Sequence, residues 1–184
     1  MVSFQELFES TPDGGKITYS QLLNTIEWLD RRNEIIKRDN NSCSNCGTSS
    51  TFNEYHNGRS INFWFGEEEN CWVKDEKGNM IESYLPKIIL ADKGYSLQVH
   101  HKYYILGKLP WEYIDEALIT YCNWCHLEWH QRNKIKYFTT DSQVEELDLT
   151  PCSNCHGTGY LPQYSHVEGG RCFHCNGERF IEFL

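Results

Sequence analysis

The chain has 184 residues, of which 39% are hydrophobic and 14% aromatic, so it is long enough to bury a core and is not a disordered tail. Its 17 Lys and Arg residues against 26 Asp and Glu residues give a net charge of −9, which excludes a generally basic, histone-like nucleic-acid binder. The chain has neither a basic start followed by an apolar run nor a stretch of about eighteen apolar residues, so we expect a cytoplasmic protein with no membrane partner.

Two capping-box patterns mark helix starts in the first part of the chain. They are Ser3-x-x-Glu6 and Thr18-x-x-Gln21, in which a hydroxyl and a longer polar side chain can each cap a backbone N–H group. Apolar residues recur at helical spacing after the second pattern. The sequence therefore predicts one N-terminal helix over residues 19–38.

Residues 47–98 are expected to form a β-rich insertion. An apolar and aromatic run covers residues 60–65, and residues 71–85 divide around a turn at 75–79, which predicts a hairpin. The acidic run at 67–69 is assigned no chemistry, because three consecutive carboxylates are usually a solvated loop.

The segment that follows the insertion predicts two strands and a helix. Residues 97–104 alternate as a strand, residues 117–121 form a second strand, and a helix follows from Cys122 with a basic end that reaches Lys136. Five Lys and Arg residues against four Asp and Glu residues over residues 100–140 make this the only positively charged segment. This small positive charge favours a partner that carries phosphate groups.

The nine cysteines are the strongest signal in the sequence, because eight of them form C-x-x-C pairs. Two thiolates separated by two residues converge on one tetrahedral ion, so four pairs in a chain without an export signal predict two four-thiolate zinc sites rather than disulfides. The ninth, Cys71, is expected to pack in the core as a small apolar residue. The four pairs are Cys43/Cys46, Cys122/Cys125, Cys152/Cys155 and Cys172/Cys175.

The C-terminal part of the chain predicts a separate zinc module. Residues 141–150 hold four acidic and no basic residues and are expected to be an acidic linker, followed by a four-cysteine zinc-binding module over 151–184. Its C-x-x-C-x-G pattern occurs twice, and the first copy resembles the cysteine-rich repeats of J-domain chaperones, which implies a small zinc-ribbon-like fold and not chaperone activity. We expect the module to dock onto DNA or a protein partner. The four ligands of this zinc are Cys152, Cys155, Cys172 and Cys175.

Four histidines form a candidate constellation. His126 and His130 stand at i and i+4 on the predicted helix, so they project from one face and can share a metal ion. His100 and His101 lie on a strand, where neighbouring side chains point to opposite sides. One of this tandem can therefore bind a metal while the other acts as a base.

Three motifs follow one another in the chain, C-x-x-C, then V-H-H, then C-x-x-C-H-x-x-x-H. With these motifs in this order, residues 28–136 resemble the HNH endonuclease family, whose site is a ββα-metal motif. The resemblance implies an α+β fold with a ββα-metal (HNH/His-Me finger) core, in a nuclease domain that covers residues 1–140. It also implies a structural zinc site that clamps the motif, with the ligands Cys43, Cys46, Cys122 and Cys125. Spacing alone leaves another pairing open, in which Cys122/Cys125 join Cys152/Cys155, but that pairing would cost the motif its adjacent clamp.

The same resemblance implies a catalytic divalent metal, Mg²⁺, Mn²⁺, Ni²⁺ or Zn²⁺, on His100, His126 and His130, with His101 as general base. Three imidazole ligands leave positions open for a phosphate oxygen and the leaving 3′ oxygen, and a neutral imidazole with a pKa of about 6.5 can accept a proton from water. The expected activity is metal-dependent hydrolysis of phosphodiester bonds in nucleic acid, with DNA favoured over RNA.

One position departs from the family pattern. Ala117 stands where the family has the asparagine that orients the catalytic histidine, and Asp115, Glu116 or Asn123 could take over this role. Loss of an orienting group usually costs rate rather than fold, so an active endonuclease is the favoured interpretation. The alternative is a catalytically inactive, zinc-stabilised HNH-fold module that binds nucleic acid or protein.

Overall fold

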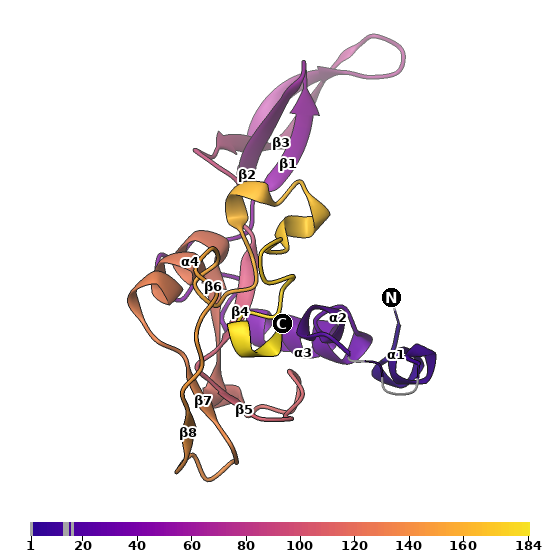
Figure 1. The fold of residues 1–184 in the computed structure, drawn as a ribbon. Helices are drawn as coiled ribbons and strands as arrows, with labels where there is room; N and C mark the ends of the chain where they lie inside the picture. Colours follow the sequence, from indigo (N-terminus) through magenta and orange to yellow (C-terminus); the bar gives the residue numbers. More distant parts are fainter. Residues whose placement is uncertain (1, 13–14, 16) are drawn as a thin grey trace. The chain divides into compact units, whose positions relative to one another are not determined.

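The computed structural model describes residues 2–12, 15 and 17–184 and has a mixed α and β architecture, as the sequence predicts (Figure 1). No helix in these ranges combines the length and the apolar character that a membrane span needs.

The chain divides into two compact units. Residues Ser50–Ser96 form one unit, and the chain up to Ser49 together with Leu97–Leu184 forms the other. The first of these lies inside the insertion predicted at 47–98. The C-terminal residues 151–184 belong to the same unit as the strands and helix that carry the histidines, whereas the sequence predicts a separate module behind a linker.

The N-terminal helices begin at the predicted capping boxes but are shorter than expected. Helix α1 (Phe4–Ser10) is capped by Ser3 and α2 (Tyr19–Leu22) by Thr18, each with both hydrogen bonds of the box. The single helix predicted over residues 19–38 is wrong, because α2 ends after one turn and α3 (Ile26–Arg38) begins anew. The break lies at Thr25. This residue is fully buried, and its hydroxyl donates to the Leu22 backbone oxygen at 2.9 Å and caps α3.

The central element is a strand–strand–helix unit. Strand β4 (Leu97–His101) pairs antiparallel with β6 (Leu118–Cys122), and α4 (Asn123–Arg132) follows β6 directly. The helix does not continue to Lys136 as the basic pattern predicts. It ends at Arg132 because Ile135 is buried and the residues after it enter strand β7 (Lys136–Phe138).

Helix α3 packs against this unit through buried apolar side chains, Trp28, Ile35 and Ile36. Polar contacts fix its C-terminal end to β6. The Arg38 guanidinium donates to the Leu118 backbone oxygen at 2.8 Å, and a carboxylate oxygen of Asp39 accepts the Thr120 backbone N–H at 2.9 Å. The first cysteine pair follows this helix end, so it is held beside β6.

A second small sheet connects the core to the C-terminal residues. Strand β5 (Tyr103–Ile105) pairs parallel with β7, and β7 pairs antiparallel with β8 (Glu146–Leu147), which lies within the predicted acidic linker. Phe180, near the C-terminus, is buried in one apolar cluster with Tyr104, Ile135 and Tyr137. The remaining elements are short 3-10 helices, η1 (Asp115–Ala117), η2 (Pro162–Tyr164), η3 (Glu168–Gly170) and η4 (Ile181–Phe183).

The unit Ser50–Ser96 is a three-stranded antiparallel sheet with the strand order β1-β2-β3 (Figure 1). Its strands are β1 (Phe52–His56), β2 (Arg59–Lys74) and β3 (Met80–Leu90), and the turn predicted at 75–79 joins β2 to β3 as expected. The prediction that Cys71 packs in the core is wrong. This residue lies in β2, is partly exposed, and its thiol contacts the Ser83 backbone oxygen at 3.5 Å, because the thin sheet buries few of its side chains.

Candidate metal centres

The strand–strand–helix unit brings three histidines together. His100 lies on β4, and His126 and His130 are one helical turn apart on α4. The backbone pairs Leu97 with Cys122, so the start of β4 lies beside the start of α4 and His100 faces the helix. All three side chains are buried, with exposed fractions of 1%, 9% and 6%.

The three rings present one nitrogen each to a common point. Nε2 of His126 lies 3.1 Å from Nδ1 of His100 and 3.1 Å from Nε2 of His130. Two ligands of one ion with metal–nitrogen distances of about 2.1 Å are about 3.0 Å apart in octahedral and about 3.4 Å apart in tetrahedral geometry. The spacing therefore fits one shared metal ion.

The second ring nitrogens of His126 and His130, which point away from the common point, show which atoms carry the lone pairs. Nδ1 of His126 lies 2.7 Å from Oε1 of Gln98, and Nδ1 of His130 lies 3.2 Å from the His156 backbone oxygen. Both oxygens accept, so both Nδ1 atoms carry the proton and both Nε2 atoms carry lone pairs. Two lone pairs at 3.1 Å repel each other unless a cation lies between them, which is what a metal-binding site provides.

Burial keeps the three imidazoles in the neutral form that binds metals. Burial lowers the pKa of His126 to about 4 and, together with the neighbouring His126, lowers the pKa of His130 to about 2. The pKa of His100 is also well below its usual range, first because it is buried and then because of the other two rings. No proton therefore has to leave these rings at neutral pH before an ion binds.

The first cysteine cluster holds the predicted residues Cys43, Cys46, Cys122 and Cys125. Sγ of Cys46 lies 3.8 Å from Sγ of Cys122, whereas a disulfide needs about 2.0 Å and a zinc tetrahedron has edges of about 3.8 Å. Asn45 donates its side-chain amide to Sγ of Cys125 at 3.3 Å. Cys122 is also the N-cap of α4, so this site joins β6, α4 and the end of α3.

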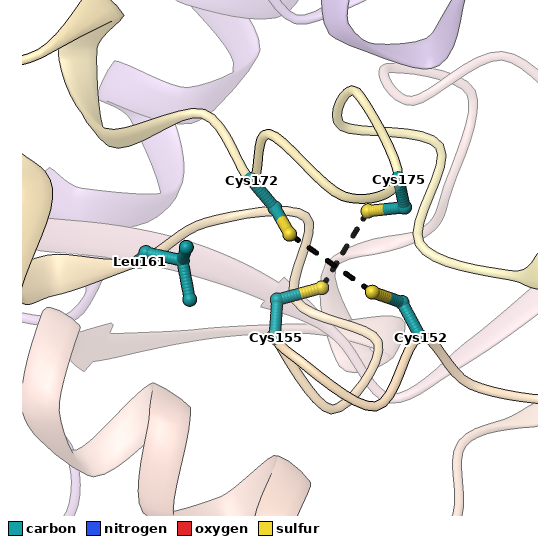
Figure 2. Close-up of a cluster of buried hydrophobic side chains, with 5 residues drawn as sticks. All are labelled: Cys152, Cys155, Leu161, Cys172 and Cys175. Carbon is teal, nitrogen blue, oxygen red and sulfur yellow. Dashed lines mark hydrogen bonds between the residues drawn. The ribbon is translucent and has the colours of Figure 1, made fainter.

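The second cluster holds Cys152, Cys155, Cys172 and Cys175, all fully buried (Figure 2). Figure 2 shows the four sulfurs pointing toward one centre. Sγ of Cys152 lies 3.9 Å from Sγ of Cys172, and Sγ of Cys155 lies 3.6 Å from Sγ of Cys175. The Gly159 N–H points at Sγ of Cys155 at 3.3 Å, as expected for a thiolate that needs donors. Both clusters therefore fit structural zinc, and the alternative pairing of Cys122/Cys125 with Cys152/Cys155 is wrong.

His101 lies outside the three-histidine group, in an aromatic pocket. Its ring stacks on Trp28 with centroids 5.2 Å apart and contacts Tyr104 and Tyr113 at 5.1 and 4.7 Å. Nε2 lies 2.9 Å from the Pro110 backbone oxygen, which can only accept, so Nε2 carries the proton and Nδ1 the lone pair. Burial lowers its pKa to about 3.

The group that orients His101 is thus a backbone carbonyl rather than any of the side chains considered from the sequence. Ala117 is buried, and its backbone oxygen accepts the Lys102 N–H at 2.8 Å. Asp115 contacts the Arg31 guanidinium at 2.5 Å instead of a histidine. The Pro110 carbonyl therefore fixes the tautomer of the neutral His101 ring.

Three further residues lie at or beside the site and were not predicted from the sequence. Gln98 and the His156 carbonyl hold the outward nitrogens of the helical pair. Arg179 is 3% exposed and lies between the rings of Tyr19 and Tyr104, at 3.6 and 3.9 Å from their centroids. The alternation of β4 could have suggested Gln98, two residues before His100 on the same face. A backbone carbonyl has no sequence signal.

The buried histidines predict an acid-sensitive fold. The pKa values of His101, His126 and His130 lie below the value of about 6.5 in an unfolded chain, so at lower pH the unfolded chain binds more protons. We expect the free energy of unfolding to fall below pH 6.5 by about 1.4 kcal/mol per pH unit for each histidine that stays neutral. Urea unfolding at pH 7, 6 and 5 measures this. Equal stability at pH 7 and pH 5 would contradict the prediction.

Comparison of the chain with protein-family models, with curated protein sequences and with solved structures gave no match in any of the three.

Proposed function

We propose that the chain is a metal-dependent endonuclease of the HNH type that hydrolyses phosphodiester bonds in nucleic acid, with DNA as the favoured substrate. The observation that carries the proposal is the convergence of His100, His126 and His130 on one point of a strand–strand–helix unit. The order of cysteines and histidines in the sequence supports the same assignment, since it resembles the ββα-metal motif of that family.

The three imidazoles leave coordination positions free. A structural zinc site has four protein ligands, as both cysteine clusters do, whereas a catalytic site has three and keeps a position for water or substrate. A divalent ion bound there supplies Lewis-acid stabilisation of the charge that develops on a phosphate oxygen and on the leaving oxygen. Gln98 and the His156 carbonyl keep the helical pair oriented for that task.

His101 is the proposed general base. Its Nδ1 would accept a proton from a water molecule while the water oxygen bonds to phosphorus and the bond from phosphorus to the 3′ oxygen breaks. The 3′ oxygen then takes a proton from solvent. The Pro110 carbonyl favours this role because it keeps the proton of the neutral ring on Nε2. The ring is 1% exposed and its pKa is about 3, so the role requires that substrate binding gives water access to Nδ1 and relieves the burial that lowers this pKa.

A nicking assay with a matched metal-site variant tests the proposal. We expect wild-type protein to nick supercoiled plasmid with at least one of Mg²⁺, Mn²⁺, Ni²⁺ and Zn²⁺, and His126→Ala to lose about 10²- to 10³-fold or more, since the ion supplies several kcal/mol. Native mass spectrometry should show one metal ion fewer in the variant, with two zinc ions kept. His166→Ala, at an exposed position, serves as the control.

The binding-module alternative has a distinct outcome in the same experiment. If wild-type protein is inert on DNA and RNA with every metal, the catalytic proposal fails. Retained, salt-sensitive binding of nucleic acid by that inert protein would then favour the zinc-stabilised binding module, for which Ala117 in place of the family asparagine is the motivating feature.

A further inference from the structure

We propose that the C-terminal four-cysteine site is a positioning element of the histidine centre, in which zinc bound by Cys152, Cys155, Cys172 and Cys175 holds the His156 carbonyl against His130 and so raises the metal affinity of the three histidines. This inference rests on the proposal that the histidines bind a metal ion. It gives the second zinc site a role inside the catalytic unit in addition to folding its own segment.

The contact comes directly from a zinc knuckle. His156 follows the ligand Cys155, and its backbone oxygen lies 3.2 Å from Nδ1 of His130. His156 and Gly157 both have positive φ angles, 52° and 83°, so the chain reverses around the sulfur and turns this carbonyl outward. The position of the carbonyl is thus set by the same turn that places the Cys155 thiolate.

The turn is held by one hydrogen bond to the sulfur and by one bond within the backbone. The Gly159 N–H points at Sγ of Cys155 at 3.3 Å, and the Thr158 N–H donates to the Cys155 backbone oxygen at 3.0 Å. Without zinc, the four thiols lie within a few ångströms of one another but share no ion that would keep this loop closed. Loss of zinc should therefore free the His156 carbonyl, which then no longer holds the proton of His130 on Nδ1.

The rest of the segment is clamped to the same core. The Arg179 guanidinium stacks between Tyr19 of α2 and Tyr104 of β5, and its backbone oxygen accepts the Cys152 N–H at 2.8 Å. Nε and Nη1 of Arg179 are buried and have no hydrogen-bond partner among the described residues, so the aromatic rings hold this side chain. Phe180 is buried in the apolar cluster with Tyr137. The zinc loop is therefore anchored on both sides of the His130 contact.

A substitution at Gly157 tests the role of the His156 carbonyl without changing any of the candidate ligand side chains. Gly157→Ala places a Cβ at φ 83°, where it meets only ordinary contacts, the nearest being Pro151 at 3.5 Å and Nδ1 of His130 at 3.6 Å. The strain falls on the peptide group that contains the His156 oxygen. Gly169→Ala is the matched control, because Gly169 has a φ of 66° in the same segment and no atom within 4 Å of its added Cβ.

Titration of the full-length protein with Co²⁺, starting from chains that hold two zinc ions, measures the affinity of the third site by its visible absorption. We expect Gly157→Ala to raise the Kd for Co²⁺ by about 10- to 100-fold and Gly169→Ala to leave it unchanged. The double variant Cys152→Ser/Cys172→Ser, which removes the second zinc, should show a loss at least as large. If Gly157→Ala does not fold, Gly157→Asn takes its place, because asparagine adopts a positive φ more readily than alanine, and its Kd for Co²⁺ should rise in the same direction.

The outcomes separate this inference from the proposed function. Wild-type Co²⁺ affinity in both the glycine and the cysteine variants overturns the inference, even if the wild type nicks DNA. The predicted affinity losses in a protein that never nicks DNA leave the inference standing and overturn the endonuclease proposal. A wild-type chain that binds no third ion overturns both.

Discussion

Replacement of His101 by glutamine is expected to lower metal-dependent plasmid nicking by about 10²- to 10⁴-fold, the usual contribution of a positioned general base, while all metal ions stay bound. The glutamine amide can still donate to the Pro110 carbonyl, which His101 contacts at 2.9 Å, and it roughly fills the pocket beside Trp28. An amide cannot accept a proton from water near neutral pH, so the variant removes the proposed base and keeps most of the packing.

His101→Ala provides the comparison that identifies a purely structural role. It removes a fully buried ring from contact with Trp28, Tyr104 and Tyr113, and the resulting cavity should cost roughly 3–5 kcal/mol, as for other large aromatic side chains. If His101 is the base, both variants lose nicking although only the alanine variant loses much stability. If His101→Gln nicks at the wild-type rate, the ring is a packing residue and the assignment of His101 as base is wrong.

The grouping of the cysteine and histidine side chains was predictable because each leaves a signature in the sequence. Thiols separated by two residues, and imidazoles four positions apart on a helix, are spacings typical of metal sites. The structure groups these side chains as expected. The groups that orient them were not predictable. Pro110 and His156 act through backbone oxygens, which every residue has, and their positions depend on how a loop and a knuckle fold against β4 and α4.

Local signals predicted the fold where they agreed with tertiary packing. The capping boxes at Ser3 and Thr18 and the turn at 75–79 appear as expected, because each stabilises its own few residues. The break at Thr25 was missed because a threonine in an amphipathic pattern reads as helix interior until its burial and its cap to α3 are known. The Asn57-Gly58 turn between β1 and β2 was not predicted, although Asn-Gly is a clear two-residue hairpin signal and both residues have a positive φ.

Cys122→Ser is expected to give the largest loss of stability of any single substitution considered for this chain. Structural zinc sites contribute about 10–16 kcal/mol of apparent folding free energy, which matches or exceeds the total of about 5–15 kcal/mol for a typical domain. Serine can still cap α4, so the loss reports on the thiolate and not on the helix end. We expect one zinc ion fewer per chain by mass spectrometry and no cooperative thermal transition near that of the wild type.

The matched control is Cys71→Ser, which changes the one cysteine that lies in none of the metal-binding groups of the described residues. Cys71 is partly exposed in β2 of the other compact unit, so the zinc content and the transition temperature of the Cys71→Ser variant should stay close to wild-type values. Because β6 and α4 meet at Cys122, and α4 carries His126 and His130, loss of the first zinc should also abolish binding of the third ion. A Cys122→Ser protein that has lost the first zinc, melts like the wild type and still binds an ion at the three histidines would show that the fold holds the histidine centre without this clamp.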